Sequence, residues 1–269
     1  MAKSKTLLKV SRYKPKTEKG LFDIPVDIII PYHGQYDKVT RLLESIFKLT
    51  RTNRYNICLV DDCSKNEDFL LRMEEIARKR GFQSIFKGIR LEEHKGFVSA
   101  IKAGFEATQN PYVCFVNSDC KVEDPNWLRS MGSCLQNLKS KNVRMVAPMT
   151  GKIVGGNINQ KGDKSSLDDE HYILEGDDEF LSLYCFMCHR ELFDRCGGFF
   201  KEYPYGFYED MEFSFRMRKK GFKQAVCRTS WIYHEGSCTI KDLWKKDSRI
   251  RDIMEKDNRE RCIADMKQI

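Results

Sequence analysis

The sequence lacks any apolar run that approaches the ~20 residues of a membrane-spanning helix. Its basic N-terminal stretch also lacks the apolar core of a signal peptide, and no internal repeat or low-complexity tract occurs in the chain. These absences argue against a membrane-embedded protein, a secreted precursor and a solenoid. We expect a cytoplasmic protein, and peripheral attachment to a membrane surface through its basic segments stays open.

A basic stripe with interleaved aromatic residues, the usual signature of a nucleic-acid interface, is absent as well. Much of the net charge of +8 comes from lysines and arginines near the two ends, which suits phosphates or anionic lipid but also an ordinary solvated surface. We therefore expect no nucleic-acid partner. The chain has 269 residues, 41% hydrophobic and 32% charged, which is the composition of a globular protein with a sizeable core.

No disulfide framework is visible. The eleven cysteines form an odd and scattered set, and several lie inside apolar runs, as Cys58 and Cys114 do. Cysteines in such runs behave as small core hydrophobes, which is typical of a reducing compartment. Cys185 and Cys188 have the spacing of zinc ligands, but no second such pair exists and their apolar neighbours indicate a buried strand. We favour the strand over a metal or redox site.

Alternating strand and helix patterns run through the first half of the chain. Strands are predicted at residues 26–30, 55–60, 84–89 and 112–116. Helices are predicted after residue 37 and at residues 67–80 and 96–108. Asp37 is the candidate cap of the first helix, Pro31 ends the first strand, and Gly81 ends the second helix. The alternation predicts a single-domain, Rossmann-like α/β fold with a mostly parallel sheet flanked by helices.

Polar clusters directly follow three of these strands. They are Pro31-Tyr32-His33, Asp61-Asp62 and Asn117-Ser118-Asp119. Right-handed crossovers place the carboxyl ends of parallel strands along one edge of the sheet, where ligands of open α/β folds bind. We therefore expect the three clusters to meet in one crevice.

The later part of the chain is patterned differently. Residues 150–180 are rich in glycine and acids and predict a long loop that shapes a binding site or acts as a lid. Beyond it, we expect a helix from Glu209-Asp210, a strand at 223–227 and a polar helix from about 240 to the end.

Each candidate residue has a functional and a structural interpretation. Asp119 can hold a divalent cation beside a diphosphate, or it belongs to a strand-ending turn. Asp62 can accept hydrogen bonds from a base or ribose, or it caps a helix. The pair Glu209-Asp210 can supply a general base, or it only complements a helix dipole. His234 is either a metal ligand or a core histidine.

Taken together and in order, the motifs resemble those of the inverting family-2 glycosyltransferases with the GT-A fold. The resemblance covers roughly residues 24–236, and it rests on the order of the motifs because each alone is weakly specific. The matching segments are Val26–Tyr32, Leu59–Ser64, His94–Phe97 with Ala100, Tyr112–Asp119, Gly197–Phe199, Glu209–Arg216 and His234.

The resemblance implies a role for each site residue. The implied nucleotide-binding residues, with Tyr32 and Asp62 at the base, are Pro31, Tyr32, Asp62, Lys95, Gly96, Asn117 and Ser118. Asp119 matches the metal-holding acid of the family's Asp-x-Asp motif, whose first acid is replaced here by Asn117, and His234 completes the metal site in some members. Asp210 matches the catalytic base, with Glu209 beside it.

The implied activity is a metal-dependent, inverting transfer of a sugar from a nucleotide-sugar donor to a hydroxyl of a glycan or glycoconjugate acceptor. The Gln-x-x-Arg-Trp signature of processive synthases is absent, so a non-processive transfer is implied. We expect Mn²⁺ rather than Mg²⁺, because an imidazole ligand suits magnesium poorly.

The same resemblance divides the chain into a basic tail (1–20), a GT-A domain (21–239) and a C-terminal helical extension (240–269). Within the domain, residues 21–120 form the nucleotide-binding half and residues 121–239 the acceptor and catalytic half. Two alternatives are a catalytically silent nucleotide-sugar-binding protein and a sugar nucleotidyltransferase. The second needs a glycine-rich basic loop after the first strand, which this chain lacks.

Overall fold

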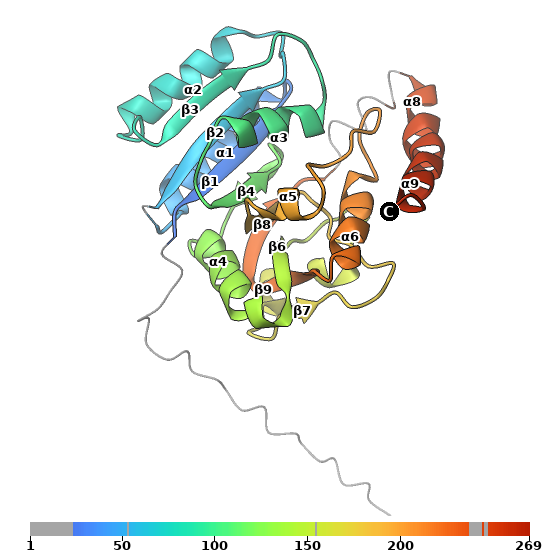
Figure 1. The fold of residues 1–269 in the computed structure, drawn as a ribbon. Coiled ribbons are helices and arrows are strands. Elements are labelled where there is room, and N and C mark those ends of the chain that lie inside the picture. The colour runs from blue at the N-terminus through green and yellow to red at the C-terminus, as the bar shows by residue number, and fades with distance from the viewer. Residues whose placement is uncertain (1–23, 53, 154, 237–243, 245–246) are drawn as a thin grey trace, which may run out of the picture.

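The computed structural model describes residues 24–52, 54–153, 155–236, 244 and 247–269. The basic tail predicted at residues 1–20, and the start of the helix predicted from about 240, lie outside these residues. A nine-stranded sheet forms the centre of the described part, in the order β3-β2-β1-β4-β8-β6-β9-β5, with β7 paired to β9 (Figure 1).

The strands are β1 (Val26–Tyr32), β2 (Tyr55–Asp61), β3 (Phe86–Arg90), β4 (Tyr112–Val116), β5 (Cys120–Val122), β6 (Val143–Met149), β7 (Tyr172–Ile173), β8 (Cys185–His189) and β9 (Lys223–His234). The helices are α1 (Tyr36–Leu49), α2 (Asp68–Lys79), α3 (Phe97–Glu106), α4 (Trp127–Asn137), α5 (Leu192–Arg195), α6 (Glu209–Lys219), α8 (Ser248–Asp252) and α9 (Asn258–Met266). Short 3₁₀ turns lie at Lys139–Lys141, Ile158–Gln160 and Lys164–Ser166, and a π-helical turn at Ile253–Asp257 joins α8 to α9.

The half of the sheet formed by β1 to β4 is parallel, as predicted: β1 pairs with β2 and β4, and β2 pairs with β3. The other half is mixed, because β8 runs antiparallel to both β4 and β6 while β9 runs parallel to β6. The strand predicted at 223–227 continues to His234. The sheet is thus a parallel half extended by strands of both directions.

Two boundary predictions are wrong. Pro31 does not end the first strand, since β1 continues to Tyr32 with Pro31 paired to Val60. The backbone groups of Val26 and Tyr32 form hydrogen bonds toward β2, so the backbone of Pro31 faces the other side, toward β4. The pairing of β1 with β4 ends at Ile29, so the missing N–H of Pro31 removes no hydrogen bond from the sheet. Asp37 does not cap α1 either.

Gln35 occupies the capping position of α1 in a left-handed conformation, and Asp37 lies in the first turn. The apolar face predicted for this helix is confirmed, because Val39, Leu42 and Ile46 are buried. Gly81 follows α2 with a positive φ of 80°, as expected of a glycine that ends a helix.

Helices cover both faces of the sheet. One hydrophobic core lies under α1, α2 and α4 and includes Leu42, Phe69 and Trp127. The second lies under α3, α5 and α6 and includes Ile101 and Phe213. None of the helices in the described ranges has the length and apolar character needed to cross a bilayer.

Asp27 joins four segments at the end of the sheet where β1 begins. Its carboxylate is 1% exposed and accepts hydrogen bonds from the backbone and side chain of Asn110, both at 2.7 Å. Asn56 on β2 and Arg190 after β8 donate to the same carboxylate at 3.2 Å. A buried carboxylate with this many donors connects the parallel half of the sheet to β8.

We expect Asp27→Ala to lower the free energy of unfolding by about 3 kcal/mol, because it leaves the guanidinium of Arg190 and the amide of Asn110 without their acceptor. Urea unfolding followed by circular dichroism measures this. Asp68→Ala, an exposed acid in the first turn of α2, is the matched control and should cost no more than about 1 kcal/mol. Equal losses in the two variants would contradict the role of Asp27.

Candidate active site

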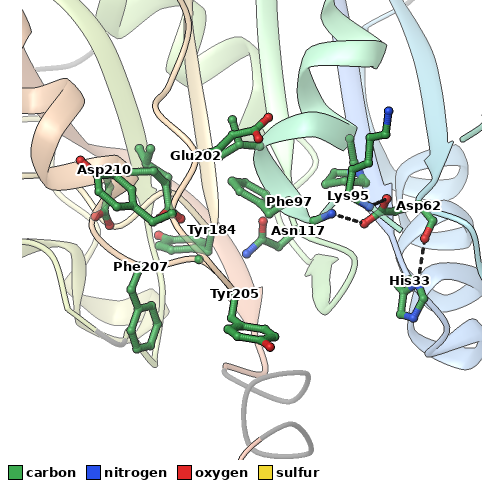
Figure 2. Close-up of a pocket in the computed structure, with 18 of the residues that line it drawn as sticks. His33, Asp62, Lys95, Phe97, Asn117, Tyr184, Glu202, Tyr205, Phe207 and Asp210 are labelled. Carbon is green, nitrogen blue, oxygen red and sulfur yellow. Dashed lines mark hydrogen bonds between the residues drawn. The ribbon is translucent and has the colours of Figure 1, made fainter. Parts of the chain in front are cut away.

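A cavity of about 730 Å³ opens at the carboxyl ends of β1, β2 and β4. Every site residue predicted from the sequence lines it: Pro31, Tyr32, Asp62, Lys95, Gly96, Asn117, Ser118, Asp119, Glu209, Asp210 and His234. Figure 2 shows Asp62, His33 and Lys95 at one end, Asp210 and Tyr184 at the other, and Asn117 and Phe97 between them. The expected crevice is therefore present.

The adjacent acids Asp61 and Asp62 have different surroundings. Asp61 is fully buried, forms an ion pair with Arg90 and accepts the backbone N–H of Ser64 at 2.9 Å. Asp62 lines the cavity. Asp61 therefore holds the turn after β2, and Asp62 is the acid of the pair that a ligand can reach. Asp62 does not cap α2, which begins only at Asp68.

The Asp62 carboxylate also shapes the turn before α3. It accepts the backbone N–H of Lys95 and of Gly96, both at 2.8 Å, and it lies 2.8 Å from the ring of His94. Gly96 has a φ of 88°, which disfavours a side chain at this position. Asp62 thus links the end of β2 to the N-terminus of α3.

The two histidines at this end were missed from the sequence. The rings of His33 and His94 lie 4.0 Å apart between centroids, and the carbonyl of Asp62 is 2.7 Å from Nδ1 of His33. Both belong to segments quoted above, so their position beside Pro31 and Lys95 was the available signal. Both histidines line the cavity.

The side chains of Tyr32 and Lys95 make their main contacts outside the cavity, contrary to expectation. The side chain of Tyr32 is buried against Phe69, with ring centroids 5.4 Å apart, so its ring belongs to the core under α2. Burial and the nearby Asp61 carboxylate raise the pKa of Tyr32. The ammonium of Lys95 pairs with Glu93 at 3.1 Å, and the backbone of Lys95 makes the contact to Asp62.

The β5–β9 ladder brings Asp119 and His234 together. Cys120 is paired with His234, and the backbone N–H of Glu235 bonds the carbonyl of Asp119 at 3.1 Å. Nε2 of His234 lies 3.4 Å from Oδ1 of Asp119. Ligand atoms about 2.1 Å from one ion, at angles between octahedral and tetrahedral, are about 3.0–3.4 Å apart, so this spacing fits a shared cation.

The surroundings of His234 set its tautomer. Nδ1 lies 3.1 Å from the carbonyl of Lys152 and donates to it, which leaves the Nε2 lone pair directed toward Asp119. The ring stacks on Tyr184 at 4.8 Å, which limits its rotation. Sγ of Cys120 is also near, but burial raises its pKa and it donates to the carbonyl of Tyr184. Asp119 and His234 are therefore the pair suited to a cation.

Asn117 and Ser118 form the turn between β4 and β5. The backbone N–H of Asn117 bonds the carbonyl of Tyr184 at 2.8 Å, and its carbonyl accepts from Cys120 at 3.0 Å. The strand-ending turn of the structural interpretation is thus present. The same turn also places Asp119 at the cavity.

The acids Glu209 and Asp210 begin α6 after an unusual loop. Tyr205, Gly206, Phe207 and Tyr208 all have positive φ values between 62° and 94°. Such a run is costly for non-glycine residues and requires outside support. The support comes from α9, where Asn258 donates to the carbonyls of Pro204 and Gly206, both at 2.8 Å.

Both residues of this pair are half-buried at the wall of the cavity, where their carboxyl groups are poorly solvated. Burial raises the pKa of Glu209 to about 7, and burial together with the charge of Glu209 raises the pKa of Asp210 to about 8. Oε2 of Glu209 is buried, and no described residue bonds to it. The helix dipole favours the charged forms by only about 0.3–1 kcal/mol, so desolvation dominates. The two groups titrate as a pair near neutral pH.

A family model described as "Glycosyl transferase family 2" matches residues 27–197, well over half of the chain. The chain belongs to glycosyl transferase family 2. The match includes the strand-end clusters and Asp119 but ends before α6 and His234. The placement of Glu209, Asp210 and His234 therefore rests on the geometry of the cavity, not on the family match.

Solved structures agree on the fold. The chain superposes on GalNAc-T7, solved with UDP, GalNAc and Mn²⁺, with a TM-score of 0.62 and 19% identity over 81% of this chain and 44% of that one. The fragment 1–349 of S. aureus TarS with UDP-GlcNAc superposes with a TM-score of 0.57 and 17% identity over 78% of this chain and 58% of that one. The mannosyltransferase PcManGT from Pyrobaculum calidifontis, solved with GDP-Man and Mn²⁺, superposes with a TM-score of 0.59 and 12% identity over 79% of this chain and 57% of that one.

This family member thus has the GT-A fold of glycosyltransferases and spans about half the length of those three chains. No curated protein matches the chain. The strands that extend the parallel half of the sheet carry the Asp119–His234 pair, and α6 carries the buried acids.

Two segments that the sequence singled out do not reach the cavity. Among the described residues of 150–180, none lines it; the segment packs instead through buried groups such as Gln160 and Leu174. Cys185 and Cys188 are buried in β8, as predicted, and belong to cores on opposite faces of the sheet. They cannot bind one ion together.

The C-terminal extension does reach the cavity, through Arg261 of α9. The guanidinium lies 5.5 Å from the ring centroid of Tyr203. Tyr205 and Glu202 also line this side, and the loop that carries them is pinned to α3 by a 2.5 Å bond from Ser99 to Glu202. These residues were not predicted, because nothing in their local sequence indicates which distant element they approach.

Proposed function

We propose that this chain transfers a sugar from a nucleoside-diphosphate donor to an acceptor hydroxyl, with inversion and with the help of a divalent cation. The observation that carries the proposal is one cavity with Asp62 at one end, Asp119 and His234 together on its wall, and a buried carboxyl pair at the other end. The acceptor is proposed to be a glycan or glycoconjugate, and the transfer non-processive.

The proposed division of labour follows the geometry. Asp62, with the turn at residues 94–96, holds the nucleoside end of the donor. Asp119 and His234 hold the cation, which when bound offsets the negative charge of the leaving diphosphate. Mn²⁺ is proposed over Mg²⁺ because one ligand is an imidazole nitrogen. The neighbours that hold Mn²⁺ with UDP or GDP-Man support this assignment by analogy of fold.

Asp210 is proposed to accept the proton of the acceptor hydroxyl. The oxygen of that hydroxyl forms a bond to the anomeric carbon as the bond from that carbon to the diphosphate oxygen breaks, so the configuration inverts in a single displacement. A carboxylate whose pKa is raised toward neutrality by burial is a stronger base than an exposed one. Glu209 beside it raises the proton affinity of Asp210 further.

A panel of UDP- and GDP-sugars, with and without Mn²⁺, tests the function. We expect at least one donor to bind more tightly with Mn²⁺ and to release its nucleoside diphosphate slowly in the absence of acceptor. Binding without any release or transfer would support the silent binding protein instead. Failure of every donor to bind in calorimetry would reject the proposal.

Asp62→Ala should weaken the binding of nucleoside diphosphate both with and without Mn²⁺. The variant removes an acceptor at the nucleoside end and also releases the backbone of Lys95 and Gly96. Isothermal titration calorimetry with UDP and GDP measures the effect. His234→Ala is the control, since it should weaken only binding in the presence of Mn²⁺. A loss in Asp62→Ala confined to the Mn²⁺ titration would contradict its assignment to the nucleoside.

Asp210→Asn should lower turnover by about 10²–10⁴-fold, the usual contribution of a general base, while donor binding persists. The wild-type rate should rise with pH through about 7 to 8, because the base must lose its proton and its pKa lies near 8. Glu209→Gln removes the negative neighbour, which lowers the pKa of Asp210, so its rate should rise at lower pH than the wild type. Stopped assays of nucleoside diphosphate release across pH measure the rates of the wild type, Asp210→Asn and Glu209→Gln.

Near-normal turnover of Asp210→Asn, together with an inactive Glu209→Gln, would transfer the role of base to Glu209. A wild-type rate that stays flat from pH 6 to 9 would show that neither buried carboxyl limits the reaction.

His234→Ala should raise the Mn²⁺ concentration needed for half-maximal activity, and wild-type activity should be higher with Mn²⁺ than with Mg²⁺. The reason is that the variant removes the imidazole and leaves Asp119 as the one proposed protein ligand of the cation. Metal titrations of turnover, with melting curves alongside, measure this. His189→Ala, a histidine at the end of β8, is the matched control. A purely structural histidine would lower the melting temperature and leave the Mn²⁺ requirement unchanged.

A further inference from the structure

A second group of metal-ligand side chains lies away from the cavity. Cys134, His171 and Cys227 have their ligand atoms, two Sγ and one ring nitrogen, within 4.8 Å of one another. None of the three lines the cavity. Cys227 and His234 are both on β9 and are separated by seven residues, which is about 20 Å along a strand. The two groups are therefore independent.

Three different elements contribute to this group. β7 runs antiparallel to β9 with Tyr172 opposite Val226, a register that sets His171 opposite Cys227. Helix α4 lies beside β9 (Figure 1), packs against it and carries Cys134. Residues 134, 171 and 227 thus meet only because a loop, a helix and a strand are assembled together.

The environment of the group is unusual for its chemistry. Both cysteines are fully buried, and Nδ1 of His171 is buried without a hydrogen-bond partner among the described residues. A buried polar nitrogen without a partner costs about 1–3 kcal/mol, so an orphan of this kind calls for a ligand. Burial lowers the pKa of His171, so the imidazole is neutral, which is the form that binds metals.

We propose that Cys134, Cys227 and His171 bind one Zn²⁺ ion that fastens the segment at residues 150–180 to α4 and β9. Two thiolates and a neutral imidazole form a donor set that zinc prefers over Mg²⁺ or Mn²⁺. Two thiolate charges balance the charge of the ion, so the buried group becomes neutral as a whole. The fourth position is left to water, which can approach because His171 is only half-buried.

Binding of the ion must displace both thiol protons. Without metal, the hydrogen bond to Cys227 and burial raise the pKa of Cys134. Zinc binds cysteine as the thiolate, so each of the two cysteines gives up its thiol proton to the solvent when the ion enters. Two protons therefore leave for each Zn²⁺ that enters, and the apparent affinity should increase with pH. A disulfide between Cys134 and Cys227 is the competing use of the two sulfurs, and it would leave Nδ1 of His171 without a partner.

The fastening links the proposed zinc site to the fold around the cavity. Residues 150–180 lead directly into Ser182, Leu183 and Tyr184, which line it, and Tyr184 stacks on His234. Gln160 bonds Ser182 from within the same segment, at 2.7 and 3.1 Å. A zinc ion at His171 would stabilise this segment without contacting any ligand of the cavity.

Co²⁺ titration of the reduced, metal-free chain tests the proposal. We expect thiolate-to-cobalt charge-transfer absorption with a stoichiometry of one, displaced by Zn²⁺, and one tightly held zinc per chain by elemental analysis. Cys134→Ala and Cys227→Ala should lose the band. His171→Gln, at a half-buried position and the variant most certain to fold, should weaken zinc binding more than about 100-fold, beyond the loss typical of an outer-shell change.

Two controls separate this site from the cavity. Cys120→Ala removes a fully buried thiol beside Asp119, and His234→Ala removes the other imidazole; both should keep the charge-transfer band. Zinc should also raise the melting temperature of the wild type and not that of His171→Gln. A reduced wild type without the band, a band that persists in His171→Gln, or a Cys134–Cys227 disulfide in protein isolated with reductant would overturn the proposal.

Discussion

The central sheet is covered by helices on both faces, so its strands can present polar side chains to a ligand only where they end. This constraint organises the whole molecule. β1, β2 and β4 are parallel, and their carboxyl ends therefore open at one edge, where Asp62 and Asn117 reach the cavity. Every side chain of β1 is buried, and its one charged residue, Asp27, is satisfied by four donors.

The mixed half of the sheet contributes candidate metal ligands that the parallel strands alone do not supply. β5 is short and pairs antiparallel with the end of β9, and this pairing places Asp119 beside His234. The far end of β9 packs with α4 and β7 around Cys134 and His171. One long strand therefore takes part in both groups of candidate metal ligands, at positions too far apart to interact directly.

The buried acids show how a costly conformation is maintained. Tyr205 to Tyr208 adopt left-handed backbone conformations that their side chains disfavour, and Asn258 on α9 holds two carbonyls of this turn. The same turn delivers Glu209 and Asp210 to a poorly solvated place, where their charged forms are disfavoured. Strain in the loop and desolvation of the acids are both offset by packing of a helix that is distant in the sequence.

Much of the fold was determined by the sequence alone. Period-two and period-3.6 patterns predicted β1 to β4 and the helices between them, because burial of one face imposes those periods. The order of the motifs indicated the family, and the rule on strand ends predicted that the three polar clusters after the strands meet in one crevice. Errors arose at the boundaries of elements, as at Pro31 and Asp37. There the partner strand or the turn geometry determines where a strand ends or a helix begins.

Tertiary structure alone decided the remaining features. The ion pair that holds the buried Asp61 is made with Arg90, which is on another strand. The tautomer of His234 and the group of Cys134, His171 and Cys227 arise from neighbours tens of residues away. The raised pKa values of Glu209 and Asp210 arise mainly from burial. Local sequence sets which elements form, but solvation and hydrogen bonding at a site depend on which distant elements pack around it.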